Sequence, residues 1–506
     1  MNMALLGVDI GTSGTRAVLF GEAEEIITSS YQEYPIFYPQ PGWGELDAEI
    51  IWTAFRKTVR EVAHKHRTQI KAMSLSCMSN NIVPVRRDGS AIRNGILAFD
   101  NRATEEAQII LDTIGELPYF KIRGGRPRPV SGLSKILWLK KNEPETFHQT
   151  WKFMTFADLI RTRLGFPAVI DYATAASSLP YDIRKMDYSD TLLKEFGLKR
   201  EMFSEPVPTD AVLGEIGLEV RTELNLSKGV KIVTGGYDTH CGILGAGVTR
   251  TTPQIMADMA GTFERIACVK TKPILTKQAL DNDINSGCNI IKNSYIVSTA
   301  LASSGSIVRW FRDELAWEEK LTSREDGTNV YDTMFAPLNF EGGKIMVIPY
   351  FAGSVGNSQA KGAFLGLTLG TSRQEILQGI VEGITHEMTD LVDRLEKLSD
   401  TPIEGIRAFG GPAKSSKWLQ LKADISGKNV ESLQIEEASA LGAAILAGVA
   451  TGVYDSYEQA VKTTVKIKKT YLPRPEISQI YQRQHQIYKQ LVESLKPVNQ
   501  ELNYLD

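Results

Sequence analysis

A strand, a turn of small residues and a second strand open the sequence, and the same pattern returns near its middle. Residues Ala4–Phe20 read ALLGVDIGTSGTRAVLF, in which apolar and β-branched runs flank a Gly/Thr turn. Residues Gln254–Val269 read QIMADMAGTFERIACV and again place an aspartate shortly before a Gly-Thr pair. Such self-similarity predicts a duplicated domain. Because Gly-Thr pairs are common, these residues alone leave duplication and coincidence equally open.

The length of the chain agrees with two copies. At 506 residues it suggests two domains of roughly 200–250 residues each, because a single core seldom grows larger. The boundary would fall near Val248–Pro253, just before the second copy begins. The predicted domains are therefore residues 1–250 and 251–506.

Strands and helices alternate along the chain. A helical pattern follows Asp47, and buried strands are predicted at Ile70–Cys77 and Ile96–Asp100. This alternation indicates α/β domains. Near the end, a proline-containing break precedes an apolar stripe that predicts a terminal helix over about residues 475–497.

Charge and composition exclude several kinds of partner. The 57 basic residues nearly balance the 60 acidic ones, so the net charge of −3 gives no reason to expect nucleic acid or an acidic membrane. We find no signal peptide and no run near the roughly 18 apolar residues of a membrane span. The four cysteines form no C-x-x-C pair. They predict reduced thiols in a cytoplasmic protein.

The first Gly/Thr turn, Asp9–Thr15, has the chemistry of a phosphate site. Small residues let the backbone approach an anion, and N–H groups and threonine hydroxyls can surround it. Asp9, at the end of the first strand, could hold Mg²⁺ directly or through water. The alternative is an ordinary hairpin with small residues at its corner.

Two further segments place polar or small residues after a strand. Asp238 follows the apolar strand Lys231–Val233 in GGYDTHCG, where α/β folds place ligands, and could accept a proton from a substrate hydroxyl. It could instead cap the following helix. Gly410 and Gly411 follow the strand Gly405–Phe409 and could let a flat base lie against the backbone.

Taken together and in order, these segments resemble the FGGY family of carbohydrate kinases over nearly the whole chain. DIGTSGTRAVLF is similar to the family's first phosphate loop, GGYDTHCGILGAG to its catalytic segment and MAGTFE to its second phosphate loop. The helix KILWL, the segment SSGSIVRWFRD, the signature-like GAFLGLTLGTSRQEILQGIVEGI and the adenine-side FGGPAKSSKWLQLKADISG follow the family order. Seven matches in order make duplication the expected arrangement.

The resemblance implies a fold and an activity. The fold would be α/β, with two ribonuclease-H-like domains of the actin-like ATPase type flanking a catalytic cleft. The activity would be transfer of the γ-phosphoryl group of ATP to a hydroxyl of a small sugar, a ketose or polyol such as a pentulose or 6-deoxyhexulose. The implied partners are the sugar, ATP and Mg²⁺, with neither nucleic acid nor membrane, and a homodimer is possible.

The resemblance also implies roles for individual residues. Asp238 would be the catalytic base, and Asp9 and Asp238 would hold the metal. The predicted ATP contacts are Gly11, Thr12, Thr15, Gly261, Thr262, Gly305, Gly410, Gly411 and Ser415. The predicted sugar contacts are Ser79, Asn80, Asp100, Arg102 and Asp238.

The sugar site departs from the family's familiar members. Ser79 and Asn80 occupy the place of a Met-His pair in xylulose kinases and an Arg-Glu pair in glycerol kinases, and Ala98 replaces a tryptophan of both. The runs G-x-D-T and G-T-x-E look closer to the fuculose-kinase-like branch. Two alternatives stay open: an actin-like ATPase without sugar kinase activity, and a sugar-binding regulator without catalysis.

Overall fold

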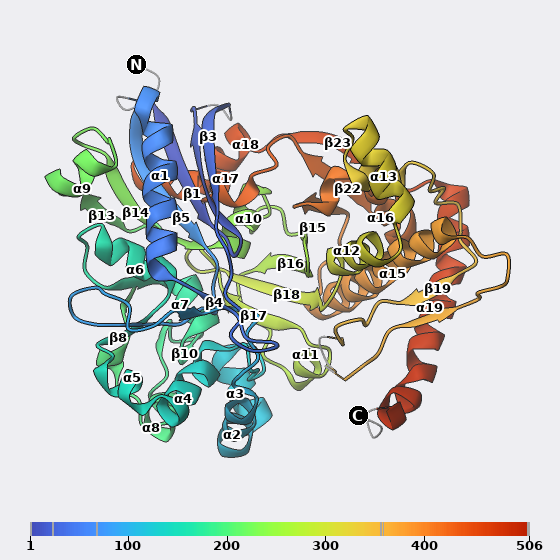
Figure 1. Cartoon of the computed structure of the whole chain (residues 1–506), viewed down its shortest axis with the longest axis horizontal. Coiled ribbons are helices and arrows are strands. Elements are labelled where there is room, and N and C mark those ends of the chain that lie inside the picture. Colours follow the sequence, from blue (N-terminus) through green and yellow to red (C-terminus); the bar gives the residue numbers. More distant parts are fainter. Residues whose placement is uncertain (1–2, 23–24, 67–68, 355–356, 358, 503–506) are drawn as a thin grey trace.

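The computed structural model describes residues 3–22, 25–66, 69–354, 357 and 359–502. Two lobes, each built on one large sheet, lie side by side (Figure 1). In the part of the chain that the structure describes, no helix is both long and apolar enough to cross a membrane.

The N-terminal sheet has six strands in the order β13-β14-β5-β1-β2-β3. Strands β1, β2 and β3 form an antiparallel meander, β5 and β14 continue it in parallel to β1, and β13 closes it antiparallel. The bounds are β1 Ala4–Ile10, β2 Gly14–Phe20, β3 Ile26–Glu33, β5 Ile70–Cys77, β13 Val212–Glu215 and β14 Lys231–Tyr237.

The C-terminal sheet repeats this plan with one extra strand, in the order β17-β18-β16-β15-β21-β22-β23. Its strands β15, β16 and β18 form the meander, and β21 and β22 continue it in parallel to β15. The bounds are β15 Ile255–Ala260, β16 Glu264–Lys270, β17 Asn285–Cys288, β18 Tyr295–Leu301, β21 Gly405–Phe409, β22 Asn429–Leu433 and β23 Ile467–Tyr471. The shared order and directions confirm the predicted duplication.

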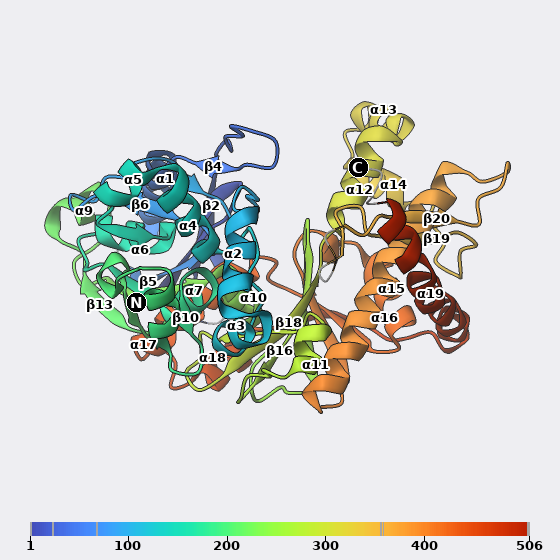
Figure 2. The ribbon, with the colours of Figure 1, turned by 90° about the horizontal axis from the view of Figure 1, so that it is seen from below.

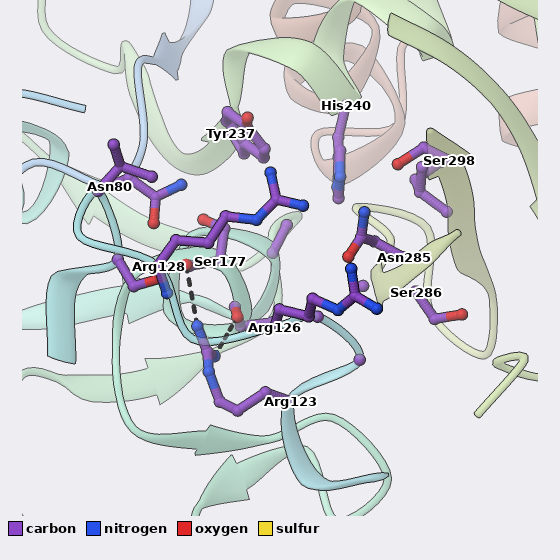
Figure 3. Close-up of a pocket in the computed structure, with 18 of the residues that line it drawn as sticks. Asn80, Arg123, Arg126, Arg128, Ser177, Tyr237, His240, Asn285, Ser286 and Ser298 are labelled. Carbon is purple, nitrogen blue, oxygen red and sulfur yellow. Dashed lines mark hydrogen bonds between the residues drawn. The ribbon is translucent and has the colours of Figure 1, made fainter. Parts of the chain in front are cut away.

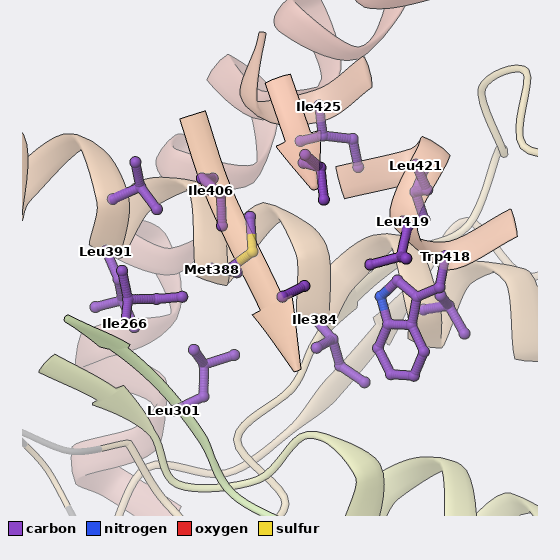
Figure 4. Close-up of a cluster of buried hydrophobic side chains, with 14 of the residues drawn as sticks. Ile266, Leu301, Ile384, Met388, Leu391, Ile406, Trp418, Leu419, Leu421 and Ile425 are labelled. Carbon is purple, nitrogen blue, oxygen red and sulfur yellow. The ribbon is translucent and has the colours of Figure 1, made fainter. Parts of the chain in front are cut away.

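Helices cover both sheets. Helix α1 (Ala48–His66) packs on β2 and β3 with the spaced apolar residues Ile51, Phe55 and Val59, all buried. In the C-terminal lobe, α15 (Arg373–Ser399) and α16 (Ser416–Ser426) cover the sheet, and their side chains meet those of the strands in one apolar core (Figure 4). Burying each such side chain contributes about 1.5–3 kcal/mol.

One helix from the C-terminal half of the chain packs on the N-terminal sheet. Helix α17 (Ala438–Ala450), although late in the chain, packs on β1 and β5 of the N-terminal sheet and on α10 (Asp238–Gly245), and both views place it there (Figures 1 and 2). Its sequence ASALGAAILAGVA is apolar on all sides because both faces are covered. A Cβ on Gly442 would lie 1.9 Å from the carbonyl oxygen of Cys241, so only glycine permits this approach.

Two predicted elements need correction. The strand expected at Ile96–Asp100 is only β7, Gly95–Ile96, because Asp100 turns inward and accepts hydrogen bonds from the backbone N–H groups of Gly44 (2.7 Å) and Arg102 (3.0 Å). The terminal helix, α19, spans Pro475–Leu502 and continues beyond Pro497. Buried Asn499 anchors its last turn by accepting a hydrogen bond from the N–H of Lys361 at 3.1 Å.

Candidate active site

Asp238 lies where β14 gives way to α10. Its Oδ1 accepts hydrogen bonds from the N–H and hydroxyl of Thr239, at 2.5 and 3.3 Å. The N-cap of α10 is Tyr237 and carries no side-chain cap, so the structure does not support the alternative that Asp238 is the helix cap. Surrounding protein raises the pKa of Asp238 by desolvation, although its side chain keeps some contact with solvent.

Asp9, near the end of β1, lies close enough to Asp238 to feel its charge. Its Oδ1 accepts a hydrogen bond from the hydroxyl of Ser76 at 2.6 Å. Burial, and next the charge of Asp238, raise the pKa of Asp9 to about 7. Among the described residues no basic side chain forms an ion pair with either carboxylate, and no third acidic, histidine or cysteine side chain completes a metal cluster. Two carboxylates fit Mg²⁺, which takes its remaining oxygens from water and phosphates.

The two predicted phosphate loops occupy equivalent places in the two sheets. In the first, Gly11 and Thr12 are partly exposed between β1 and β2, whereas Thr15 is fully buried within β2. In the second, the N–H of Gly305 donates to the carbonyl oxygen of Gly261 at 3.0 Å, and that of Ser304 donates to Thr262 at 3.1 Å. The structure therefore brings Gly305, at the start of α12 (Gly305–Glu314), to the second loop.

The predicted adenine-side residues end the neighbouring strand β21. Gly410 has a φ of +96°, and a Cβ there would lie 2.2 Å from the carbonyl oxygen of Ala260, so this position needs glycine for packing. Around Gly411 the space is open. The hydroxyl of Ser415 accepts a hydrogen bond from the N–H of Trp418 (3.3 Å) and caps α16. Of the three, Gly411 has the most room for a ligand.

Ser79 and Asn80 follow β5, as predicted, and a buried lysine fixes their loop. Lys135, in α4 (Gly132–Asn142), donates to the carbonyl oxygens of Asn80 (2.7 Å) and Leu97 (2.6 Å). Burial lowers the pKa of Lys135 to about 7. Ser79 is buried, and Asn80 has a φ of +54° and lines a cavity. The helix that contains KILW therefore positions the predicted sugar loop. The sequence of this helix alone did not reveal that role.

Asp100 and Arg102 lie elsewhere. The Arg102 guanidinium makes two hydrogen bonds to Asp100, at 2.7 and 2.9 Å, and a third to Glu45 at 2.9 Å. It is also stacked over the rings of Trp43 and Trp138, 3.9 and 5.0 Å from their centroids. Neither residue lines the cavity. The structure thus gives this pair a packing role, and contact with a sugar stays a prediction.

A cavity of about 210 Å³ lies between the two halves of the chain. Its walls include Asn80, Tyr237 and His240 from the first half and Arg265 and Ser298 from the second. Tyr237 and His240 flank Asp238 in sequence, so the cavity adjoins the predicted base. Among the lining residues that the sequence analysis did not predict are Arg123, Arg126, Arg128, Tyr237, Arg265, Asn285 and Ser298. The basic segment RGGRPR, residues 123–128, was the available signal.

Comparison with known proteins decides the family. Models of the N-terminal and C-terminal domains of the FGGY family of carbohydrate kinases match residues 4–245 and 257–451. The chain belongs to the FGGY family. It is therefore a carbohydrate kinase, a phosphotransferase with an alcohol group as acceptor, and membership implies ATP as co-substrate. This confirms the predicted family, fold class and enzyme class.

Relatives that match over nearly their whole length agree with this membership. A xylulose kinase of Staphylococcus epidermidis is 25% identical over 505 residues, covering 98% of both chains, and a gluconokinase of Bacillus subtilis is 26% identical over 466 residues, covering 90% of both. Ligand-bound xylulose kinase from Lactobacillus acidophilus superposes with a TM-score of 0.88 at 22% identity, covering 99% of this chain and 100% of the other. Gluconate kinase from the same organism gives 0.86 at 22% identity, covering 98% of both.

Proposed function

We propose that this kinase transfers the γ-phosphoryl group of ATP to a hydroxyl of a small ketose or polyol, such as a pentulose or 6-deoxyhexulose, with Asp238 as general base. The observation that carries the proposal is the Asp238 carboxylate itself. It is unpaired with any described cation, has a raised pKa and adjoins the interlobe cavity. A raised pKa makes a carboxylate a better match for a hydroxyl proton near neutral pH.

The proposed step uses few groups. The acceptor hydroxyl gives its proton to Asp238 while its oxygen bonds to the γ-phosphorus, and the bond from that phosphorus to the bridging oxygen breaks to release ADP. Gly11 with Thr12, and Gly261 with Thr262, would hold the phosphates. Bound Mg²⁺, held by Asp9 and Asp238, would offset the phosphate charge. Closure of the lobes would exclude water that could otherwise accept the phosphoryl group.

The proposal also covers the cellular location and the oligomeric state of the enzyme. The four cysteines are buried free thiols, which supports a cytoplasmic location. A homodimer stays a prediction.

A coupled ADP-release assay over ketoses, polyols and their acids tests the activity. We expect release above the ATP-only rate for at least one small sugar, with one phosphate transferred per ADP. ATP hydrolysis that no sugar stimulates but a protein partner does would favour the actin-like ATPase. Sugar binding without any ADP release would favour the inactive regulator.

Asn80 is expected to read the sugar through its side-chain amide. Losing one buried hydrogen bond to a sugar hydroxyl costs about 1–3 kcal/mol, or roughly ten- to a hundredfold in discrimination. Asn80→Ala should therefore narrow the kcat/KM ratio between the best sugar and its deoxy analogue by this factor and leave ATP affinity unchanged.

The positive φ of Asn80 supplies a matched control. Alanine is strained in this conformation by roughly 1–2 kcal/mol, whereas glycine is not. Both Asn80→Ala and Asn80→Gly should narrow the ratio equally, but only the alanine variant should lose that much stability. If the ratio is unchanged in both while the melting temperature falls, Asn80 is a turn residue and does not contact the sugar.

A further inference from the structure

The interlobe cavity has an unusual charge. Four arginines line it, Arg123, Arg126, Arg128 and Arg265, and no aspartate or glutamate is among its lining residues. The rest of its polar lining is neutral and includes Asn80, Tyr237 and His240, whose pKa burial lowers to about 3. A cavity wall of this composition favours the binding of a negatively charged ligand.

The partners of the four guanidinium groups differ. Arg123 donates to the carbonyl oxygens of Ala176 and of Ser177 (3.0 Å), so it supports the wall (Figure 3). Arg126 and Arg128 point into the same space, toward Tyr237, His240 and Asn285 (Figure 3). Arg265 donates to the hydroxyl of Ser298 at 3.1 Å.

Two carboxylates behind the wall offset part of this charge. Asp283 lies 2.8 Å from Arg126 and 3.5 Å from Arg128, and the largely exposed Glu116 lies 2.8 Å from Arg126. Among the described residues, none forms an ion pair with Arg265. The cavity therefore keeps more positive than negative charge around it.

Close packing of like charges has a cost. Burial lowers the pKa of Arg128, and the neighbouring charges of Arg126 and Arg265 lower it further, against the opposite effect of Asp283. A bound anion would offset this repulsion, because a guanidinium donates two parallel hydrogen bonds to a carboxylate or phosphate. The repulsion among these arginines is therefore consistent with a site that binds an anion.

We propose that the acceptor sugar carries an anionic group, a carboxylate or a phosphate, which Arg126, Arg128 and Arg265 bind in this cavity. This inference rests on the proposed kinase function, but it replaces the neutral pentulose or 6-deoxyhexulose as the expected acceptor with an acidic sugar or polyol. Neutral Asn80, Tyr237 and His240 would meet the hydroxyls, and Asp238, beside Tyr237 in sequence, would receive the proton of the hydroxyl that is phosphorylated.

The test compares acidic and neutral acceptors of equal chain length. We measure kcat/KM for four- to six-carbon aldonates, for ketose and alditol monophosphates, and for the matching neutral alditols and ketoses. The best acidic acceptor should exceed its neutral match by about ten- to a hundredfold, and Arg128→Met or Arg265→Met should reduce this ratio by a similar factor. Arg128→Lys should give an intermediate ratio, because lysine keeps the positive charge but lacks the two parallel N–H donors of a guanidinium group.

Controls separate this inference from general damage. Arg250 is half-exposed, lies near Glu458 and is absent from the cavity lining, so Arg250→Met should leave the activity and the acidic-to-neutral ratio unchanged. Because Arg265 also lowers the pKa of Asp238, its removal can change absolute rates, but that effect is common to all acceptors and cancels in the ratio. Melting temperatures report any loss of folding.

Calorimetry assigns the anion to its source. At least one of the two acids, the aldonate or the sugar phosphate, should bind wild-type protein without nucleotide and bind at least tenfold more weakly to Arg128→Met, whereas ATP affinity should change less than twofold. A tenfold loss of ATP affinity would mean that the arginines bind the nucleotide and would overturn the inference. Which of the two acids binds tells carboxylate from phosphate.

The outcomes also tell the two proposals apart. Preference for neutral sugars, with a ratio unchanged in the arginine variants, overturns the anion site and leaves the kinase function in place. Binding of an acidic polyol that Arg128→Met abolishes, without ADP release for any acceptor, supports the anion site and contradicts the kinase function. If no acidic polyol binds or reacts, the anion site is wrong.

Discussion

Replacing Asp238 with asparagine should lower kcat by about 10²- to 10⁴-fold while ATP binding stays within about twofold of wild type. The amide keeps the size of the carboxylate but cannot accept the proton of the attacking hydroxyl, and general-base catalysis contributes this much. Turnover can be followed by ADP release and ATP binding by calorimetry. Near-normal turnover would show that Asp238 is not the base.

The pH profile makes this prediction sharper. The base must be ionised, so kcat/KM of the wild type should fall as the pH drops through the pKa of Asp238, which desolvation has raised. Because Asp9, with a pKa of about 7, interacts with Asp238, the acidic limb reports the pair. It should lie above the ordinary aspartate range of about 3.9. In Asp238→Asn, the residual kcat/KM should therefore fall less steeply at acidic pH, because Asp238 no longer titrates.

Lys422→Met should destabilise the C-terminal lobe by about 3–5 kcal/mol, which corresponds to a melting temperature lower by roughly 6–20 °C. Lys422, fully buried in α16, forms ion pairs with Asp258 of β15 and with Glu264 of β16, the latter at 2.8 Å. Methionine fills the space but leaves two buried carboxylates without a cation. The free-energy cost of these two unpaired, buried carboxylates exceeds what an ion pair on the surface contributes to stability.

The two buried carboxylates decide how the loss of stability in Lys422→Met depends on pH. Even beside Lys422, burial and Glu264 raise the pKa of Asp258 to about 7. Without the lysine these acids should hold protons more tightly in the folded than in the unfolded state, so stability falls as the pH rises above the unfolded value of about 4. The loss in Lys422→Met should therefore be larger at pH 8 than at pH 5.

A second lysine pair gives the control. Lys428 lies 2.6 Å from Glu396, but both side chains reach solvent, and Lys428→Met should cost no more than about 1 kcal/mol. Glu264 also accepts a hydrogen bond from the hydroxyl of Ser304 (2.5 Å), next to the second phosphate loop, so Lys422→Met should weaken ATP binding as well. Equal melting temperatures for the two variants would contradict a structural role for the buried triad.

Local patterns in the sequence predicted much of this kinase. The Gly/Thr turns between apolar strands indicated the duplication, because turn residues and β-branched runs act over a few positions. The same locality placed Asp9, Asn80 and Asp238 at strand ends, where the structure has them. It also explains the wrong strand end at Ile96–Asp100, since the contacts that stop this strand come from Gly44, far away in sequence.

The remaining features depend on contacts between distant segments. Nothing in the sequence indicated that Glu45, Trp43 and Trp138 would surround Arg102, which was predicted to contact the sugar. Sequence order likewise gave no sign that Lys422 would reach Asp258.

The charged cavity is the clearest case. Its walls come from separate stretches of both halves of the chain, while the whole protein is nearly neutral, so composition could not reveal it. Short-range patterns in the sequence determined the family, the repeated sheets and the position of the predicted base. The charge of the cavity was decided only by the tertiary structure, because electrostatic interactions depend on distance in space and not on separation along the chain.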